Sequence, residues 1–212
     1  MAWWHRKPKI TKDFEELTQT YNEKYGNHDY NSDSRSLDSS FDKILVESLG
    51  NLNGQNVLVC GANSGYEVRI LSKKFPDSRF TAVDISTDAL KKFLTEFPNV
   101  SCVHASMESL PFKDKEFDTY LNCRAIHSTD VNTEVAVNEA MRVTKGRIIL
   151  SVSNGYNVEG KIINGMYDYD TEKIDIDKPN ETLNGLKEIF QDKYNLFEAS
   201  SEAELFLIAT PI

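Results

Sequence analysis

The sequence predicts an α/β fold in which helices cover both faces of a mainly parallel sheet. Apolar runs of strand length alternate with amphipathic helical segments through the middle of the chain, an order typical of parallel sheets. The run from Val57 to Cys60 is apolar at every position, as expected of a strand buried on both faces. A turn bracketed by Gly61 and Gly65 follows and leads into a helix, which places main-chain N–H groups where a ligand can meet them.

The elements follow from periodicity and from turn residues. Ahead of the first strand we expect helices over 11–25 and 37–49. The central elements are strands over 57–60, 80–84, 100–105, 117–121 and 147–152, and helices over 66–75, 86–97 and 129–143. A polar stretch over 154–177 is expected to be a long loop or a small insertion. The last elements are a helix over 181–190 and a hairpin of strands 195–200 and 204–210.

Length and composition limit the classes of protein that fit. At 212 residues the chain is long enough for one domain with a full core. The net charge of −9 argues against a nucleic-acid surface. No run of 18 apolar residues exists and the N-terminus lacks the apolar core of a secretory signal, so we expect a cytoplasmic protein without a membrane span. Three cysteines without a CxxC pair indicate reduced thiols and no metal site.

The second strand supplies the clearest functional residue. It ends in Asp84, and an acid at this strand tip accepts hydrogen bonds from the two hydroxyls of a ribose. A dinucleotide fingerprint would place glycines at positions 61, 63 and 66, where the chain has Gly61, Asn63 and Tyr66. The poor fit of this fingerprint disfavours a nicotinamide-dependent oxidoreductase.

The turn Gly61-x-Asn63-x-Gly65 resembles that of class I S-adenosylmethionine (SAM) dependent methyltransferases, with the middle glycine replaced. The segments 107–112 and 138–147 are similar to two further motifs of that family, in the right order. The resemblance covers about residues 50–212. It implies a small-molecule methyltransferase with SAM as cofactor and a Rossmann-like seven-stranded sheet whose terminal strand is antiparallel. Residues 1–50 would form an N-terminal arm and helical cap, and residues 51–212 the SAM-binding domain.

The resemblance also implies the cofactor-binding residues. Around the methionine part of SAM these would be Gly61, Ala62, Asn63 and Gly65, with Asn122 and Cys123 on the floor beneath it. Asp84 would bind the ribose, and around the adenine these would be Ile85, Ser106 and Met107.

Three positions depart from the family pattern. Val59 stands where the family usually has an acid that helps to hold the methionine amino group, and Ser106 stands where it often has Asp. Asn63 brings a side chain into the tightest part of the turn, although Asn tolerates positive φ better than other residues with a Cβ. These departures leave open a binding or regulatory protein with a degenerate SAM site.

On the acceptor side the residues allow more than one role. A base is needed only when the acceptor must lose a proton as it attacks, and His127 is the candidate, with a capping histidine as the alternative. Arg124 could bind a carboxylate or phosphate of the substrate, or be a solvated loop residue. Tyr21 and Tyr25 could close over the cofactor or simply pack their helix, and Tyr156 could shape an aromatic pocket. We expect a small-molecule partner and no nucleic acid; a protein acceptor and the oligomeric state stay open.

Overall fold

The structure is a computed structural model of residues 1–212. It describes residues 13–25, 40–128, 130–158, 161–164, 166–168 and 173–212; for Lys24, Tyr25 and the described part of 156–175 it describes the backbone alone. The expected helix starts at Thr11, Leu37 and Thr129 and the N-terminal arm lie outside the described residues.

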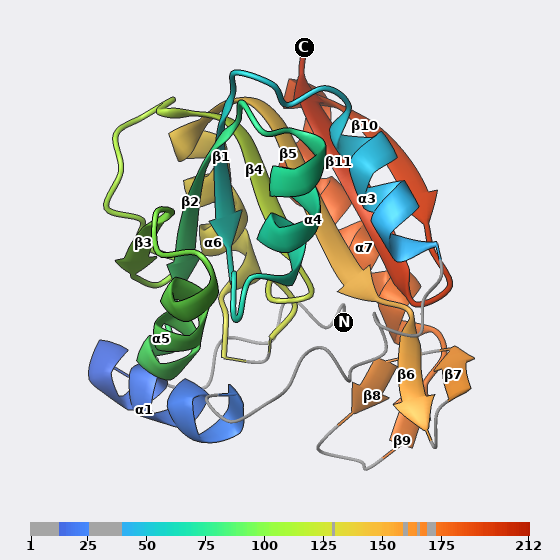
Figure 1. The fold of residues 1–212 in the computed structure, drawn as a ribbon. Helices are drawn as coiled ribbons and strands as arrows, with labels where there is room; N and C mark the ends of the chain where they lie inside the picture. Colours follow the sequence, from blue (N-terminus) through green and yellow to red (C-terminus); the bar gives the residue numbers. More distant parts are fainter. Residues whose placement is uncertain (1–12, 26–39, 129, 159–160, 165, 169–172) are drawn as a thin grey trace.

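A seven-stranded sheet forms the centre of the described chain, in the order β10-β11-β5-β4-β1-β2-β3 (Figure 1). In sequence order its strands are β1 Asn56–Cys60, β2 Arg79–Asp84, β3 Ser101–His104, β4 Phe117–Cys123, β5 Thr144–Ser153, β10 Tyr194–Ser200 and β11 Glu204–Pro211. Neighbouring strands from β3 to β5 are parallel, whereas β11 runs antiparallel to both β5 and β10. The predicted fold class is therefore confirmed, including the reversed strand near the sheet's end.

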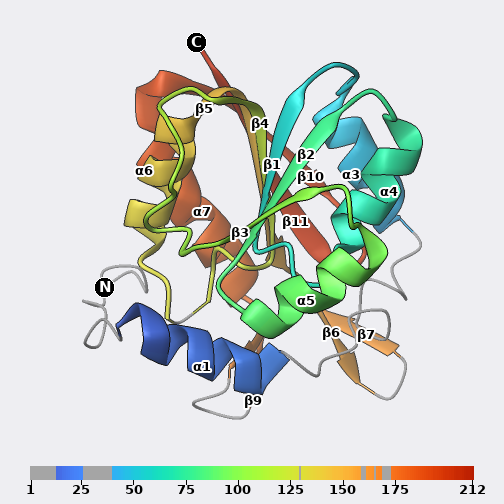
Figure 2. The same cartoon turned by 60° about the vertical axis from the view of Figure 1, so that its left-hand side comes forward.

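Helices cover both faces of this sheet, as Figure 2 shows. One face carries α3 Phe41–Leu49, α4 Tyr66–Lys74 and α5 Thr87–Glu96, and the other carries α6 Thr133–Val143 and α7 Lys178–Phe190. From Val57 to Cys60, β1 is apolar because its side chains enter the cores on both faces of the sheet. Val57 and Val59 belong to the core on the α3–α4 side, while Leu58 and Cys60 belong to the core on the α6–α7 side.

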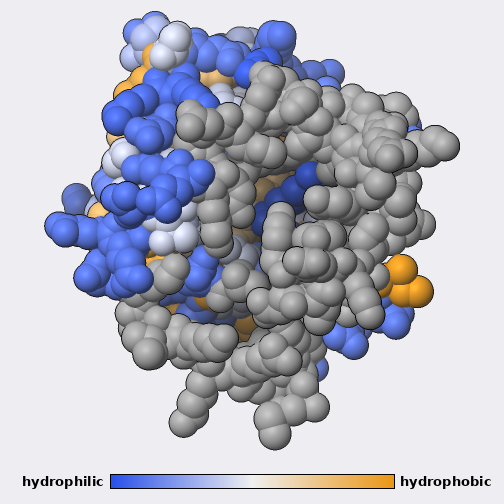
Figure 3. Space-filling view, turned by 90° about the horizontal axis from the view of Figure 1, so that it is seen from below, coloured by the Kyte–Doolittle hydropathy of each residue, from blue (hydrophilic) through white to orange (hydrophobic). Residues whose placement is uncertain are grey.

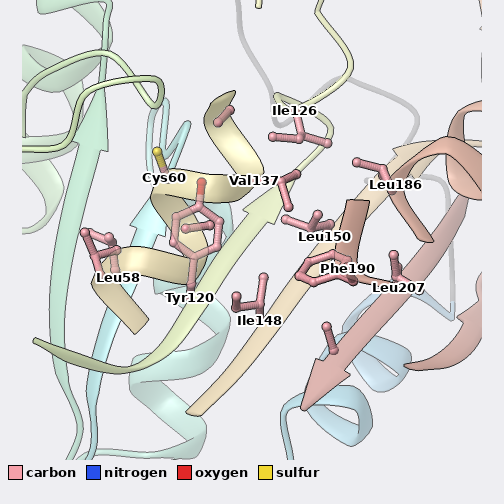
Figure 4. Packing of buried hydrophobic residues seen from close by; sticks show 14 of the residues in the cluster. Leu58, Cys60, Tyr120, Ile126, Val137, Ile148, Leu150, Leu186, Phe190 and Leu207 are labelled. Atoms are coloured by element: carbon pink, nitrogen blue, oxygen red, sulfur yellow. The ribbon is translucent and has the colours of Figure 1, made fainter. Parts of the chain in front are cut away.

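The core on the α6–α7 side joins three parts of the chain (Figure 4). Tyr120 of β4 is fully buried there, as are Val137 of α6 and Phe190 of α7. Ile126, in the loop after β4, is also fully buried in this cluster. This loop is therefore held to the helices at one of its residues, and the position of its other residues follows from that anchor.

Local capping sets the helix boundaries. The Ser86 side chain accepts a hydrogen bond from the Ala89 N–H and caps α5. The helix expected from 129 begins at Thr133 instead, because the Asn132 side chain accepts from the Val135 N–H and caps it there.

The stretch 154–177 is a small insertion rather than a long loop. Its described residues form two hairpins, β6 Gly155–Val158 with β7 Lys161–Asn164, and β8 Met166–Asp168 with β9 Lys173–Asp175. A short 3-10 helix, η3 Gln191–Lys193, joins α7 to β10. Both hairpins and the N-terminal helix α1 Phe14–Tyr25 lie at the end of the sheet where the parallel strands point (Figure 1). Within the described residues no helix is long and apolar enough to cross a membrane.

Candidate cofactor and acceptor site

The candidate site lies at the carboxyl ends of β1, β2 and β4. β1 is bordered by β2 on one side and β4 on the other, and the helices that follow β1 and β4 cover opposite faces. Ligands of open α/β sheets bind at such a switch in strand order. Figure 3 views the molecule from this end; the described side chains at its left, on the α1 side, are mainly hydrophilic.

The turn after β1 has a left-handed backbone at three positions. Gly61, Asn63 and Gly65 have φ values of 73°, 44° and 94°. The prediction that Asn63 would accept positive φ is confirmed, and its Oδ1 also accepts a hydrogen bond of 2.6 Å from the Ser64 N–H. The Ala62 N–H donates to the Val83 carbonyl at 3.0 Å, which ties the turn to β2.

The two glycines are also required by packing. A Cβ on Gly61 would lie 2.5 Å from the Cβ of Ala125, in the loop after β4. A Cβ on Gly65 would lie 2.5 Å from Cε2 of Phe97, just beyond α5. The turn therefore packs tightly against its neighbours on two sides.

Asp84 is held in place by main-chain donors. The Asn63 N–H donates to its Oδ2 and the Ser86 N–H donates to its Oδ1, each at 2.8 Å. The side chain is buried, and this burial raises its pKa above the ordinary value, while the hydrogen bonds from Ser86 and Asn63 act in the opposite direction. A carboxylate has about four acceptor positions. Asp84 therefore retains capacity to accept from ligand hydroxyls after these two bonds are made.

Val59 stands where the family usually has an acid, and this position lies in the apolar core. Val59 is 2% exposed and lies between Ala82 of β2 and Leu121 of β4 in the sheet. The residues present thus fit the ribose end of SAM, through the carboxylate chemistry of Asp84. They supply no β1 carboxylate for the methionine amino group.

The residues assigned to the adenine follow the ends of β2 and β3. The carbonyl of Ile85 accepts from Nε2 of His104 at 3.0 Å. The Ser106 Oγ accepts from the Glu108 N–H at 3.2 Å, so this hydroxyl stabilises its own turn. Sδ of Met107 lies 3.8 Å from Nδ2 of Asn122, which brings the ends of β3 and β4 together.

Asn122 and Cys123 form the end of β4. Asn122 is fully buried, and its Oδ1 accepts from the Ile126 N–H at 2.9 Å. The amide therefore shapes the loop after β4, and its Nδ2 lies 3.8 Å from the position of a Cβ on Gly61. Cys123 and Cys60 are buried, and none of Cys60, Cys102 and Cys123 forms a disulfide among the described residues; burial raises the pKa of Cys60 to about 12.

Arg124 has a partner that the sequence analysis did not foresee. Its Nε lies 2.6 Å from Oε1 of Glu204, a fully buried residue at the start of β11. Its N–H donates to the carbonyl of Ser151 at 3.0 Å, and the Ser151 hydroxyl donates to Oε2 of Glu204. The side chain is thus part of a buried ion pair, so the expectation of a solvated loop arginine is wrong.

His127 lies three residues further along the same loop. Within the described residues its buried Nδ1 has no hydrogen-bond partner. Burial lowers the pKa of His127 to about 4, with the charges of Arg124 and Lys178 acting in the same direction. The ring is therefore neutral at physiological pH and free to accept a hydrogen bond or a proton, although its low basicity makes it a weak base.

The helix α1 contacts the site from the open end of the sheet. The Tyr21 hydroxyl hydrogen-bonds the Ser128 hydroxyl, and Thr18 Oγ1 lies 3.1 Å from His104 Nε2. The Ser86 hydroxyl donates to Oδ1 of Asn22 at 2.9 Å. Tyr25 ends α1 and Tyr156 lies in β6, and their side chains lie outside the described part of the chain.

The sequence analysis missed Glu204, Ser151 and Asn22. A local signal existed for one of them, because an acid at the first position of an otherwise apolar strand, as Glu204 is, has little packing reason to be there. Ser151 and Asn22 carried no such signal, since their partners lie far away in the sequence.

Comparison with known families supports the same class of protein. The family described as "Methyltransferase domain" matches residues 58–150, which run from β1 to β5. Together with the seven-stranded sheet, this match shows that residues 58–150 are similar to the methyltransferase domain family and that the chain has the Rossmann-like fold of class I methyltransferases. SAM is the cofactor of this class.

Solved structures with the same fold are distant in sequence. A SAM-dependent methyltransferase from Aquifex aeolicus is 16% identical, with a TM-score of 0.61 over 84% of this chain and 96% of that one. The [4+2]-cyclase SpnF is 12% identical, with a TM-score of 0.66 over 97% of this chain and 99% of that one. A methyltransferase of Haloferax volcanii in complex with the activator Trm112 is 12% identical, with a TM-score of 0.59 over 96% and 97%. At these identities the likeness shows the fold.

Proposed function

We propose that this protein transfers a methyl group from SAM to a small-molecule acceptor. The observation that carries the proposal is the geometry of Asp84, a buried carboxylate at the tip of β2 that is oriented by the N–H groups of Asn63 and Ser86. A carboxylate fixed in this way is suited to two neighbouring hydroxyls. The main-chain N–H groups of residues 61 to 65 donate to acceptors within the protein, so the turn would meet the ligand through its shape rather than through these donors.

The proposed role of the chain is to align SAM with the acceptor. SAM, when bound, supplies a methyl group that is already activated by its sulfonium charge. Asp84 would fix the ribose, and the turn from Gly61 to Gly65 would surround the methionine part. His127 would hold the acceptor's polar hydrogen through its Nδ1, which has no hydrogen-bond partner among the described residues, or take a proton from an acceptor that must lose one.

A small acceptor is favoured by the cover over the site. The helix α1, in the predicted cap over residues 1–50, reaches from His104 at the end of β3 to Ser128 in the loop after β4. Its outer face exposes acidic side chains, Glu15, Glu16 and Glu23. With a net charge of −9, such a face repels RNA.

The testing experiment is calorimetric titration with SAM, S-adenosylhomocysteine and NAD. Micromolar binding of the first two without binding of NAD is the expected result. No binding at millimolar ligand would contradict the proposal and favour a regulatory protein whose cofactor site is lost, for which the buried Val59 gives a structural reason. With binding established, release of S-adenosylhomocysteine across a panel of small acceptors would identify the substrate.

A further inference from the structure

The loop after β4 combines three costly features within four residues. Arg124 has a φ of 64°, a left-handed conformation that is strained for a residue with a Cβ. Its side chain enters an ion pair with Glu204, which is 0% exposed. Close by, Nδ1 of His127 is buried without a hydrogen-bond partner in the described structure. Such costs persist where the surrounding structure enforces them, and they concentrate at functional sites.

The ion pair is not explained by stability alone. Burying two charges carries a desolvation cost that their attraction often only balances, so an apolar pair of similar volume would serve the core as well. The pair instead fixes the position of Arg124. Ser151 of β5 accepts from the Arg124 N–H and donates to the Glu204 carboxylate, so three strands determine where Arg124 lies.

The rest of the loop is fixed on both sides of His127. The Ile126 N–H donates to the Asn122 side chain at 2.9 Å, and Ile126 itself is fully buried against the α6–α7 core. The Ser128 N–H donates to the carbonyl of Ala125 at 3.2 Å. The His127 ring therefore has a defined direction, and Arg124 begins the loop that sets it.

We propose that Arg124 and Glu204 are positioning residues, whose ion pair fixes the loop that presents His127 to the acceptor. This inference rests on the proposed function for the role of His127. It assigns Arg124 to the protein's own structure, in place of direct contact with a substrate carboxylate or phosphate.

The pair also has an electrostatic consequence for the imidazole. The charges that act on His127 are those of Arg124 in its own loop and Lys178 at the start of α7, and Glu204 of β11 forms an ion pair with Arg124. The positive charges of Arg124 and Lys178 both disfavour protonation of the His127 ring. Glu204 partly cancels the charge of Arg124. Removing Arg124 and removing the charge of Glu204 should therefore change the basicity of His127 in opposite directions.

The first test is an NMR titration of the histidines, with His127 assigned by the His127→Gln variant. Arg124→Gln should raise the His127 titration midpoint by roughly half a unit or more, and Glu204→Gln should lower it. Lys145→Gln is the matched control, because Lys145 pairs with Asp118 at the other end of the sheet and should have no effect. The same midpoint in Arg124→Gln as in wild type would overturn the inference.

The second test separates position from charge. Arg124→Lys retains the cation but loses the planar guanidinium, so the His127 midpoint should stay near wild type while kcat falls at least tenfold. The KM for SAM should hold, since Asp84 and the glycine turn are untouched. Full kcat in Arg124→Lys and Glu204→Gln would overturn the positioning role. If wild type binds no SAM, the proposed function fails and with it the role of His127, whereas the titration still decides whether the pair controls the ring.

Discussion

The two halves of the site are built in different ways. On the ribose side, main-chain N–H groups of Asn63 and Ser86 hold Asp84, and these residues lie in the turns that end neighbouring strands. On the acceptor side, two buried side chains from distant parts of the chain, Arg124 and Glu204, hold the loop that carries His127. The first arrangement depends on backbone conformation, and the second depends on the whole sheet being assembled. The two halves should therefore respond differently to substitution.

The largest effect is expected on the acceptor side. Glu204→Ala leaves the Arg124 cation buried without its carboxylate, which should lower the free energy of unfolding by about 3–5 kcal/mol. Urea denaturation measures the change. The control is Glu198→Ala in the same hairpin, since the half-exposed Glu198 pairs with Lys187 and should contribute under about 1 kcal/mol. Equal effects of the two variants would show that the buried pair does not hold the sheet.

The next largest effect is expected in the turn from Gly61 to Gly65, on the ribose side. Gly61→Ala adds a Cβ 2.5 Å from Ala125 to a backbone with φ of 73°, so the free energy of unfolding should fall by about 2–3 kcal/mol. Gly54→Ala is a matched control, because Gly54 has a φ of 77° but no atom within 4 Å of the added Cβ. The difference between the two variants in thermal unfolding isolates the steric part, and no difference would show that the loop after β4 yields.

Asp84→Ala tests the ribose anchor. The substitution should weaken SAM binding by about 1–3 kcal/mol, because ligand hydroxyls would lose their acceptor. Calorimetry measures the dissociation constant, with Asp88→Ala as the control, since Asp88 is exposed on α5 and pairs with Lys91. An unchanged constant for Asp84→Ala would remove this residue from the site.

A smaller effect on the free energy of unfolding is expected when the pH is lowered, through the protonation of His127. The pKa of His127 is about 4 in the fold against an ordinary 6.5, so the unfolded chain binds the extra proton first as the pH falls. From pH 7 to pH 5.5 this residue should lower the free energy of unfolding by about 1 kcal/mol. His127→Gln should remove that part of the slope. Parallel pH profiles for the variant and wild type would mean that the ring is not held neutral.

The smallest effect is expected at Asn63. Asn63→Gly restores the glycine of the family pattern at a position with φ of 44°, and loses only the bond from the Ser64 N–H. The free energy of unfolding should change by less than about 1 kcal/mol, and the affinity for SAM should change little. Asn63→Ala should cost more, because Ala has neither the freedom of Gly nor the local hydrogen bond. A tenfold loss of affinity in Asn63→Gly would give the side chain a direct role.

The features that could be predicted from the sequence are those that depend on residues close together in the chain. The alternation of strands and helices indicated the sheet, and the acid at the end of β2 indicated Asp84. The helix α6 begins later than the apolar pattern indicates, because the Asn132 side chain caps it at Thr133. The two hairpins within 154–177 were beyond prediction, since their strands have three or four residues each and little apolar alternation. The pair of Arg124 and Glu204 could not be predicted either, because only the order of strands in space brings β11 beside β5.

The contact between α1 and α5 has a consequence for hydrogen exchange. Oδ1 of Asn22 accepts from the Asp88 N–H at 3.2 Å, so a residue of α1 satisfies an amide at the start of another helix. Whenever α1 leaves the sheet, that amide loses its acceptor and meets water. The exchange rate of the Asp88 amide therefore reports how often α1 separates from α5, and a ligand that holds α1 in place should slow it.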